Sequence, residues 1–582
     1  MQKDMIDGNV IYDYIISGAT NIIRNEQNLN QINVFPVADG DTGSNLAFTM
    51  KSILARAERH SSASETLKSI SQVAIEDSFG NSGSIMAGYL YGLATESKDR
   101  DKLSYEEFVL VSVNSVDYAY KSISKPVEGT ILTVMREWAE YLNKNIHLIT
   151  SFKILFKQSL DYVSKVLENT KNQIKVLEEY NFVDAGAKGF VYFLEGIFSS
   201  IENLNDGFFS QRQESIIVSK TIHEDIKETK FQYCTEFLVE SSEDISEFLA
   251  NYSNYGDSLG LNHIGNYYKL HIHTNTPASV YDAISKRANI IKAKVDDMNM
   301  QQLIVNQPKA TIGLFTDSIA DVNEDLKKRY LIQTLPMHFV LDGTDRLDRL
   351  LINNENVFNV LDDAKEFPKS AQPSDSDIRR LLNQLTHHFE YVLGIIVSDK
   401  MSGTYEKINR IIQQEGYSNI RVIDSRTNSA AQGLLLYDAI KMIEEKQKFE
   451  AIVAHLEADR SKYKILVEIK DLSYATQSGR VPKIIGKLTK WLKVPIVISI
   501  DESGNGIVKK RFNLLKMIKQ TFKNHKTATY GLVYTGDFDK VAKRIEEIQG
   551  YLGKKPLFVE PTSAVVAAFV GKNAIGIGYK EE

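Results

Sequence analysis

Two aspartates separated by one residue stand in the segment 33–45, NVFPVADGDTGSN. Asp39 and Asp41 lie in a glycine-containing loop, so both carboxylates can be directed at one point. Carboxylate oxygens that converge in this way suit Mg²⁺, which prefers hard oxygen ligands and phosphate. Behind them, hydroxyls and free N–H groups at the start of an expected helix, NLAFTM, would favour a phosphate group. The alternative is a plain turn followed by a helix cap, because Asp-Gly-Asp is common in turns.

Three further polar, glycine-containing segments each precede an expected helix. They are GNSGS at 80–84, EGT at 128–130 and VDAGAKG at 183–189. Backbone N–H groups at such junctions bind anions, although each segment alone could be a simple cap. The chain has no Walker A sequence and no G-x-G-x-x-G pattern after an expected strand. A nucleotide site built from these loops would therefore be of neither the P-loop nor the Rossmann type.

Cys234 is the only cysteine, and His271 and His273 stand two residues apart in an expected strand. Side chains at positions i and i+2 of a strand share a face, so the two imidazoles can bind one ion together. With Cys234 on a neighbouring strand they would form a set suited to Zn²⁺. The alternative is a buried thiol with two surface histidines.

Polar residues also follow three expected strands in the C-terminal part of the chain. They occur at 316–318, 398–404 and 424–425. Ligands of open α/β sheets bind at the carboxyl ends of strands, so we expect these residues to border one crevice that suits a carboxylate or a phosphate. The alternative is that each polar residue caps the helix that follows it.

The elements that must position these residues change along the chain. Apolar residues recur at helical spacing up to about residue 200, which predicts an all-helical region. Shorter strand-like runs and short helices follow to about residue 303 and predict a small α+β domain. Continuous apolar runs then alternate with helical stretches, which predicts an α/β domain with a buried, largely parallel sheet. We expect three domains: 1–202, 203–308 and 309–582.

The composition excludes other classes of protein. The 582 residues include 69 Lys and Arg against 75 Asp and Glu, a net charge of −6, and 43% are hydrophobic. This balance excludes a disordered acidic chain and a generally basic nucleic-acid binder, so we expect no nucleic-acid partner. The single cysteine, the absence of a leader-like segment and the lack of a run of roughly 18 apolar residues indicate a cytoplasmic protein.

One segment departs from this balance. Residues 480–526 carry 12 Lys and Arg against 2 acids. A solvated face is one interpretation. The other is transient contact with an anionic membrane surface, where each nearby basic residue contributes about 1 kcal/mol.

The motifs NVFPVADGDTGSN, GNSGSIMAG, KPVEGTILTVMREW and VDAGAKGF resemble, in order and spacing, the DhaL (DAK2) kinase domain in the form found in bacterial fatty acid kinase. The resemblance covers residues 1–200 and implies a helical barrel that binds Mg²⁺ and ATP. It implies that Asp39 and Asp41 are the catalytic metal ligands, with Asn33 in place of a third, acidic ligand. Phe79 departs from the family, which usually has Arg there. The resemblance assigns nucleotide contacts to Thr42, Ser44, Asn45, Asn81, Ser82, Gly83, Thr130 and Asp184.

YCTEFLVE and KLHIHTN resemble the middle domain of fatty acid kinase, which implies a zinc site at Cys234, His271 and His273.

FTDSIADV, KSAQPSDSDI, SDKMSGTYEKI, VIDSRTNSAAQG and SGRVPK resemble the DegV family of fatty-acid-binding proteins over residues 311–582. This resemblance implies a two-lobed α/β domain that buries an acyl chain. It implies that Ser370, Ser402 and Thr404 hold the carboxylate. Phe569 departs from the family pattern, which has a histidine at this position.

The resemblances imply that one chain joins a fatty acid kinase to the protein that presents its lipid. The expected reaction forms acyl phosphate and ADP from a fatty acid and ATP, and the family implies a homodimer. Two alternatives stay open. One is a kinase of the dihydroxyacetone type that acts on a small hydroxylated substrate, which the lack of that family's covalent substrate-holding domain disfavours. The other is a lipid-binding or regulatory protein without enzymatic activity.

Overall fold

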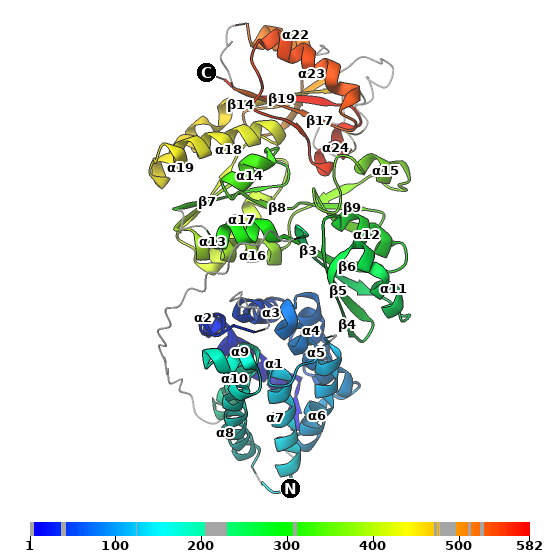
Figure 1. Ribbon diagram of the computed structural model, residues 1–582, viewed down its shortest axis with the longest axis vertical. Coiled ribbons are helices and arrows are strands. Elements are labelled where there is room, and N and C mark those ends of the chain that lie inside the picture. The colour runs from blue at the N-terminus through cyan, green and yellow to red at the C-terminus, as the bar shows by residue number, and fades with distance from the viewer. Residues whose placement is uncertain are drawn as a thin grey trace. The chain divides into compact units, whose positions relative to one another are not determined.

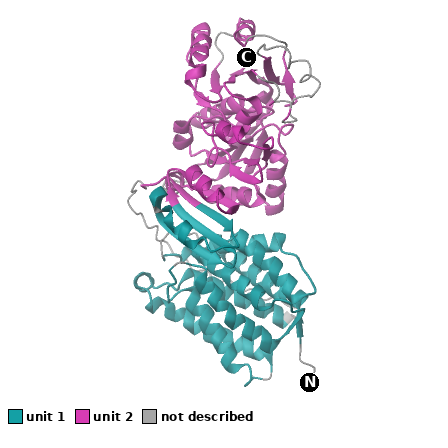
Figure 2. Ribbon diagram, turned by 90° about the vertical axis from the view of Figure 1, so that its right-hand side faces the viewer, with its two compact units in different colours: residues 1–225, 236–272 teal, residues 226–235, 273–582 magenta. Residues whose placement is uncertain are grey.

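A computed structural model describes most of the chain: residues 5–35, 42–123, 125–149, 151–203, 230–306, 311–470, 474, 477, 496–509, 514–523 and 529–581. The contacts within it define two compact units (Figure 2). The first comprises residues 1–225 and 236–272, and the second comprises residues 226–235 and 273–582. Each unit therefore contains part of the middle segment.

The first unit consists mainly of helices around one apolar core (Figure 1). Trp138, Phe156 and Phe190 are fully buried in it, which agrees with the helical periodicity of this region. Strands β1 and β2 pair antiparallel at its edge. The elements are β1 (Met5–Asp7), α1 (Gly8–Arg24), α2 (Glu26–Gln31), α3 (Thr42–Arg56), α4 (Ala63–Glu76), α5 (Gly80–Glu96), β2 (Lys102–Ser104), α6 (Tyr105–Lys121), α7 (Ile131–Asn145), α8 (Phe152–Asn169), η1 (Thr170–Asn172), α9 (Lys175–Tyr180) and α10 (Ala185–Asn203).

Helices α1 and α10 pack closely because glycines stand where they meet. A Cβ atom at Gly196 would lie 2.4 Å from the carbonyl oxygen of Ser17 and 2.7 Å from the Cα atom of Gly18. A side chain at this position would therefore force the two helices apart.

In the part of the middle segment that the structure describes, four strands form a sheet in the order β4-β5-β3-β6. Its elements are β3 (Tyr233–Glu240), α11 (Ser246–Ala250), η2 (Asn251–Tyr255), β4 (Gly256–Ile264), β5 (Tyr267–Thr274), α12 (Pro277–Ser285), β6 (Asn289–Asp297) and α13 (Met298–Asn306). Burial alternates strictly along β5, so one face of this strand is apolar and the other polar. The strand-like run ESIIVS at 214–219, which predicts a further strand, lies outside the described residues.

The described residues of the C-terminal segment form two larger sheets and a small one. The order is β13-β12-β7-β8 in the first, β16-β15-β14-β19-β17-β18 in the second and β10-β9-β11 in the small sheet. The elements are β7 (Ile312–Asp317), α14 (Glu324–Arg329), β8 (Gln333–Leu335), β9 (His338–Leu341), β10 (Thr344–Leu347), α15 (Val357–Asp362), β11 (Lys369–Ala371), α16 (Asp375–His388), β12 (Tyr391–Ile396), α17 (Thr404–Glu415), β13 (Ile420–Asp424), α18 (Ser429–Glu444), α19 (Phe449–Asp459), η3 (Arg460–Lys462), β14 (Tyr463–Ile469), β15 (Ile496–Ile500), β16 (Gly506–Val508), α22 (Leu514–Thr521), β17 (Tyr530–Tyr534), α23 (Asp539–Leu552), β18 (Val559–Pro561), α24 (Ala564–Val570) and β19 (Ile575–Lys580).

The predicted fold class, a helical region followed by an α+β segment and an α/β domain, is confirmed. The expectation of a largely parallel sheet holds only for the first sheet, whose strands are all parallel. In the second sheet the pairs among β16, β15, β14, β19 and β17 are antiparallel. Continuous apolar runs mark strands that are buried on both faces, and helix α18 and its neighbours provide that burial whatever the strand direction.

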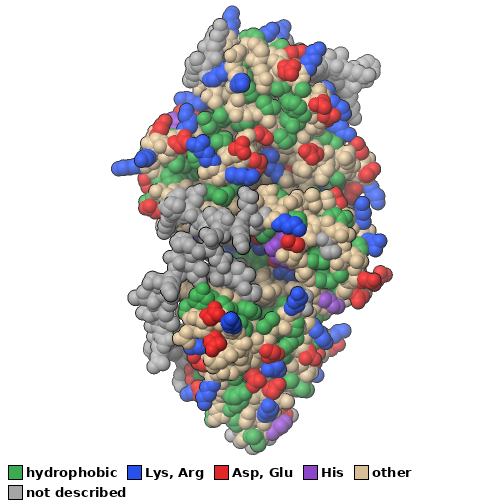
Figure 3. All heavy atoms as spheres, viewed as in Figure 1, with side chains coloured by type: hydrophobic (Ala, Val, Ile, Leu, Met, Phe, Trp, Pro, Cys, Tyr) green, Lys and Arg blue, Asp and Glu red, His purple; other side chains and the backbone are tan. Residues whose placement is uncertain are grey.

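The structure bears on two expectations about membranes. Among the described residues, no helix is both long and apolar enough to cross a membrane. Of the basic segment 480–526, the structure describes 496–509 and 514–523 only, so its membrane contact stays a prediction. On the face drawn in Figure 3, basic and acidic side chains intermingle over the described surface.

Replacing Gly196 by Ala should destabilise the first unit, because the new methyl group would overlap the backbone of α1. Overpacking of this kind costs about 1–3 kcal/mol of unfolding free energy, which urea unfolding followed by circular dichroism would measure. Gly550→Ala is the matched control, since no atom lies within 4 Å of a Cβ atom there, and it should stabilise by up to about 1 kcal/mol. Equal midpoints for Gly196→Ala and the wild type would contradict the close helix contact.

Candidate functional site

Three helices of the first unit begin close together. The side-chain nitrogen of Asn45, in the first turn of α3, would lie 2.9 Å from a Cβ atom at Gly80, the first residue of α5. A Cβ atom at Gly186, near the start of α10, would lie 2.6 Å from the hydroxyl oxygen of Ser82. Gly80 also has a φ of +63°, which favours glycine. The absence of side chains at these two glycines therefore allows α3, α5 and α10 to meet at their N-termini.

Asp184 adds the start of a fourth helix. Its Oδ1 atom accepts the backbone N–H of Ala187 at 2.7 Å, and its carboxylate also accepts the backbone N–H of Ile131, the first residue of α7. Burial raises the pKa of Asp184 to about 6, although the two N–H bonds counteract part of this shift. The carboxyl group thus holds α7 and α10 together in a nearly dry environment.

The other predicted nucleotide contacts have differing roles. The Thr42 hydroxyl donates to Asn33 Oδ1 at 2.9 Å, so the residue predicted as a third Mg²⁺ ligand lies against the first residue of α3. The Thr130 hydroxyl donates to the carbonyl of Val127 at 2.7 Å. Asn81 is exposed at the start of α5, whereas Gly83 is buried. Asp39 and Asp41 lie outside the described residues.

Ser44 does not join this group through its side chain. Its backbone N–H donates to Asn30 Oδ1 at 3.0 Å, and its hydroxyl donates to Glu26 Oε1 at 3.0 Å. The hydroxyl also accepts from Asn30 Nδ2 at 2.9 Å. Ser44 therefore fastens α2 to the start of α3, and its predicted phosphate contact stays a prediction.

The described part of the site is suited to an anion. Helix N-termini present N–H groups and partial positive charge, which favour phosphate oxygens. The exposed Asn81 and the half-buried Ser82 and Asn45 add polar side chains at the same place. The donor set therefore fits the phosphate groups of a nucleotide.

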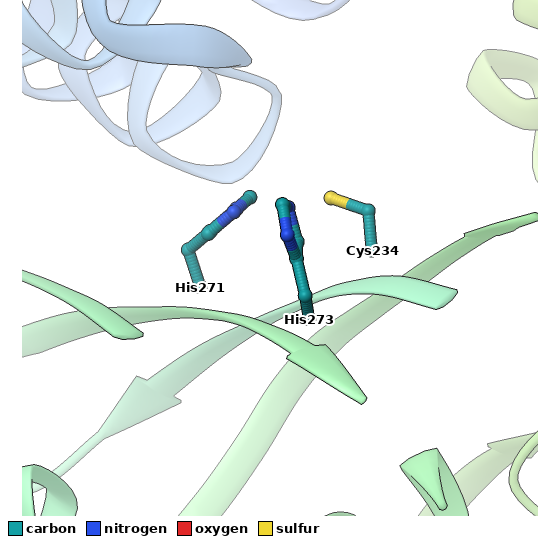
Figure 4. A group of neighbouring side chains, drawn as sticks. All are labelled: Cys234, His271 and His273. Atoms are coloured by element: carbon teal, nitrogen blue, oxygen red, sulfur yellow. The ribbon is translucent and has the colours of Figure 1, made fainter. Parts of the chain in front are cut away.

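A second group of side chains lies on the middle sheet. Cys234 is on β3, and His271 and His273 are on the adjacent strand β5. One ligand atom from each of the three lies within 4.8 Å of the other two, and the side chains point to the same side of the sheet (Figure 4). One thiolate and two imidazoles suit Zn²⁺, with a fourth position left for water or a substrate. We call these three residues the candidate metal centre.

Two residues beside this centre were not predicted from the sequence. Glu236 Oε1 lies 3.4 Å from His271 Nδ1, and Glu236 Oε2 lies 3.4 Å from Lys269 Nζ. Both side chains are largely buried. Strand alternation could have indicated both residues, because side chains two residues apart share a face of the strand. Glu236 is two residues from Cys234, and Lys269 is two residues from His271.

The second unit contains an apolar cavity. Its empty space, including the part that is open to solvent, is about 1010 Å³, and both Ser370 and Ser402 line it. The hydroxyl oxygens of Ser402 and Thr404 are 2.7 Å apart. Thr404 is fully buried, so it supports Ser402 from outside the lining. Phe569 also lines the cavity and stacks on Phe367 with ring centroids 6.1 Å apart.

The cavity lies beyond the carboxyl ends of β7 and β12, but of the polar residues expected to border it, only Ser402 is among the described residues that line it. Ile319 and Val397, which follow these strands, line it. Asp317 instead holds the two strand ends together, because its carboxylate accepts the backbone N–H of Val397 at 2.7 Å and that of Ile319 at 3.0 Å. Burial raises the pKa of Asp317 to about 6. This polar residue is therefore structural, although it joins two strand ends and does not cap the next helix, α14, whose N-cap is Asn323.

Family models match three segments of the chain: the DAK2 domain at 36–199, the FakA-like middle domain of fatty acid kinase at 230–303, and the DegV family at 311–582. An uncharacterized protein of Staphylococcus epidermidis is 30% identical over 453 residues, which cover 73% of this chain and 80% of that protein. The chain belongs to the same family as this staphylococcal protein. It combines a DAK2 domain, a fatty acid kinase-type middle domain and a DegV domain, as the motifs predicted. The matched segments lie within the three predicted domains, whose boundaries stay predictions.

Other similarities cover about half of this chain. An uncharacterized protein of Staphylococcus haemolyticus is 30% identical over 51% of this chain, and the chain spans only 56% of that protein's length. A DegV family protein from Thermus thermophilus, described by its fatty acid binding, is 26% identical, with a TM-score of 0.43 over 47% of this chain and 100% of that chain. DegV from Bacillus subtilis, described as a fatty acid binding protein, is 19% identical, with a TM-score of 0.42 over the same shares.

As pH rises, the DAK2 domain of the Asp184→Asn variant should gain unfolding free energy relative to the wild type. Burial raises the folded-state pKa from the ordinary 3.8 to about 6, so ionising Asp184 costs folding free energy that is absent at low pH. This cost grows as pH rises through that interval and then stays constant. Between about pH 5 and about pH 7.5, the wild type should lose about 1–2 kcal/mol relative to the variant.

The measurement is urea unfolding of both proteins at the two pH values, without nucleotide or metal. Asp117→Asn is the control, because Asp117 is exposed on α6 of the same domain and should show no such pH dependence. A stability difference between wild type and Asp184→Asn that does not change with pH would contradict the burial argument.

Proposed function

We propose that the protein transfers the γ-phosphoryl group of ATP to the carboxylate of a fatty acid, which yields acyl phosphate and ADP. The observation that carries this proposal is the combination of DAK2, fatty acid kinase-type middle and DegV domains in one chain. The first two are domains of a kinase family, and the motifs of the third resemble those of fatty-acid-binding proteins.

The DAK2 domain would bind ATP where its helices begin. The N–H groups at the start of α5, with the side chains of Asn45 and Ser82, would donate hydrogen bonds to the phosphate oxygens. Asp39 and Asp41, with Asn33, would hold Mg²⁺, and this ion would neutralise charge on the transferring phosphoryl group. By joining α7 to α10, Asp184 would keep these donors in fixed positions.

The reaction itself demands little of the protein. A fatty acid oxygen attacks the γ-phosphorus of ATP while the bond from this phosphorus to the bridging oxygen of ADP breaks. The carboxylate is already ionised at neutral pH, so no general base has to remove a proton. Rate enhancement would therefore come from positioning and charge neutralisation.

The DegV domain would supply the lipid. Its cavity is lined mainly by apolar side chains, which suits an acyl chain, and the Ser370 and Ser402 hydroxyls would bind the carboxylate. Thr404 would orient Ser402 through the contact between their hydroxyls. Phe569 would place an aromatic ring beside the ligand where a histidine is usual in the family.

Joining donor and acceptor in one chain has a kinetic consequence. A tether holds the two domains at an effective concentration in the millimolar range when short and flexible, provided the geometry permits contact. The chain would form a homodimer, as the resemblance to fatty acid kinases implies, and transfer could then also occur between protomers.

The candidate metal centre would bind Zn²⁺, and the basic segment 480–526 would make transient contact with an anionic membrane.

Replacing Asp41 by Ala should abolish ATP consumption that depends on added fatty acid, because the Mg²⁺-binding carboxylates carry the charge neutralisation. ADP release measured with and without palmitate tests this, and the loss should be about 100-fold or more. Asp117→Asn again serves as the surface control and should retain wild-type turnover. Fatty-acid-dependent ADP formation that survives in Asp41→Ala would refute the proposed mechanism.

Replacing Ser402 by Ala should weaken fatty acid binding to the DegV domain about 10-fold, because a hydrogen bond to a charged group contributes about 1.5–3 kcal/mol. Displacement of a fluorescent fatty acid by palmitate measures this affinity. Ser418→Ala is the matched control, since Ser418 is exposed and does not line the cavity. Unchanged affinity in Ser402→Ala would place the carboxylate elsewhere.

A further inference from the structure

Strand β5 has a row of partly exposed side chains within the first unit. Tyr267, Lys269 and His271 alternate with buried residues, so they share one face. Tyr267 packs against the core of the helical domain, and His271 belongs to the candidate metal centre. Lys269 stands between them along the strand. The same row of side chains thus extends from the helical domain to the metal ligands.

Lys269 contacts the segment that precedes the candidate phosphate-binding turn, Gly80–Gly83. Its ammonium group donates a hydrogen bond to the carbonyl oxygen of Ser78 and lies 5.4 Å from the centroid of the Phe79 ring. Ser78 is 3% exposed, and a buried carbonyl of this kind needs a donor. A charged donor makes a hydrogen bond roughly twice as strong as a neutral one. Lys269 therefore fixes the backbone immediately before α5.

Phe79 adds a second contribution to this arrangement. Its ring also packs edge-on against Phe48 of α3, with ring centroids 4.9 Å apart. The Phe79 ring is also attracted to the Lys269 ammonium group by a cation–π interaction. Phe79, the residue before the turn, is therefore restrained by two contacts. A cation thus lies beside the turn although residue 79 is not itself basic.

Glu236 links Lys269 to the candidate metal centre. Its Oε2 atom lies 3.4 Å from Lys269 Nζ, and its Oε1 atom lies 3.4 Å from His271 Nδ1. Only 13% of the Glu236 side chain and 14% of the Lys269 side chain are exposed, so solvent screens this pair weakly. A carboxylate on Nδ1 leaves Nε2 of the same histidine for a metal ion, an arrangement common in zinc sites.

We propose that Lys269 is a positioning residue for the Gly80–Gly83 turn, and that through Glu236 it couples nucleotide binding at this turn to metal binding at the candidate metal centre. This inference rests on the proposed function, which assigns a nucleotide phosphate to the turn. A bound Zn²⁺ ion would fix the ring of His271, and the fixed ring would hold Glu236 and Lys269 in the geometry that the turn requires. Because binding free energies are reciprocally linked, nucleotide would also raise the affinity for the metal.

The test measures the affinity of the full chain for a non-hydrolysable ATP analogue by calorimetry, in zinc-loaded and zinc-depleted protein. Zinc removal should weaken binding to the wild type about fivefold or more. Lys269→Met should bind weakly in both states, whereas Lys269→Arg should recover affinity and zinc dependence. Lys294→Met is the matched control: this lysine is on β6 of the same sheet and pairs with Asp296, and its side chain is 17% exposed. It should behave as the wild type does.

Zinc content and thermal unfolding separate coupling from damage to the fold. Lys269→Met should keep one zinc ion per chain and the wild-type unfolding temperature. If it does not, Glu236→Gln provides the second variant, because it weakens the link while keeping the side-chain shape, and it too should abolish the zinc dependence of nucleotide affinity.

The contrary outcomes are distinct. A wild type that takes up zinc but binds no nucleotide would refute the proposed function and this inference with it. If the wild type binds nucleotide equally well with and without zinc, or if Lys269→Met and Glu236→Gln keep the wild-type zinc dependence, the coupling alone is refuted. A Lys269→Arg variant as weak as Lys269→Met would exclude a role for the positive charge.

Discussion

The meeting of several helix N-termini around the buried carboxyl group of Asp184 is the constraint on which the DAK2 domain depends. The first turn of each helix has N–H groups without partners inside that helix, and these donors need acceptors. Asp184 accepts from Ile131 and Ala187, and thereby satisfies donors of two helices. The remaining donors lie where Gly80 and Gly186 leave space. The apolar core fixes the helix directions, and those directions bring the helix N-termini together, where an anionic ligand would be stabilised.

In the DegV domain, polar residues on and after the strands divide into two groups. One group holds the fold together: Asp317 accepts backbone N–H groups from two loops, and the Ser398 hydroxyl donates to the carbonyl of Gly504 at 2.9 Å. The other group, with Ser402 and Ser370, faces the cavity. The hydrogen bonds of the first group keep the cavity walls rigid. Because few hydroxyls remain to face a ligand, the second group can then bind a ligand selectively. An otherwise apolar lining would then shield an acyl chain along its length.

Local periodicity predicted those features that depend on local geometry. The shared face of His271 and His273 follows from strand alternation, and the helices of the first unit follow from apolar spacing. Features set by distant residues were not accessible. Ser44 stands in a motif typical of phosphate binding, yet its hydroxyl is bonded to Glu26 and Asn30, which belong to a separate helix. Strand direction in the second sheet was mispredicted for a related reason: a buried apolar run reports burial on both faces and contains no information on the direction of its neighbours.

The middle sheet is well suited to connect a metal ion with a phosphate-binding turn, because a strand is a stiff element with a fixed spacing. Residues two apart on one face are separated by about 7 Å, so a carboxylate from the adjacent strand can contact both Lys269 and His271. Glu236 occupies that position. A helix would place such residues on different faces, and a loop would not hold them in register. The stiffness would also limit the effect of a bound ion, which would act on the turn only through the Lys269 and Glu236 side chains. A coupling of modest size, adjusting nucleotide affinity rather than switching it, is what this geometry supports.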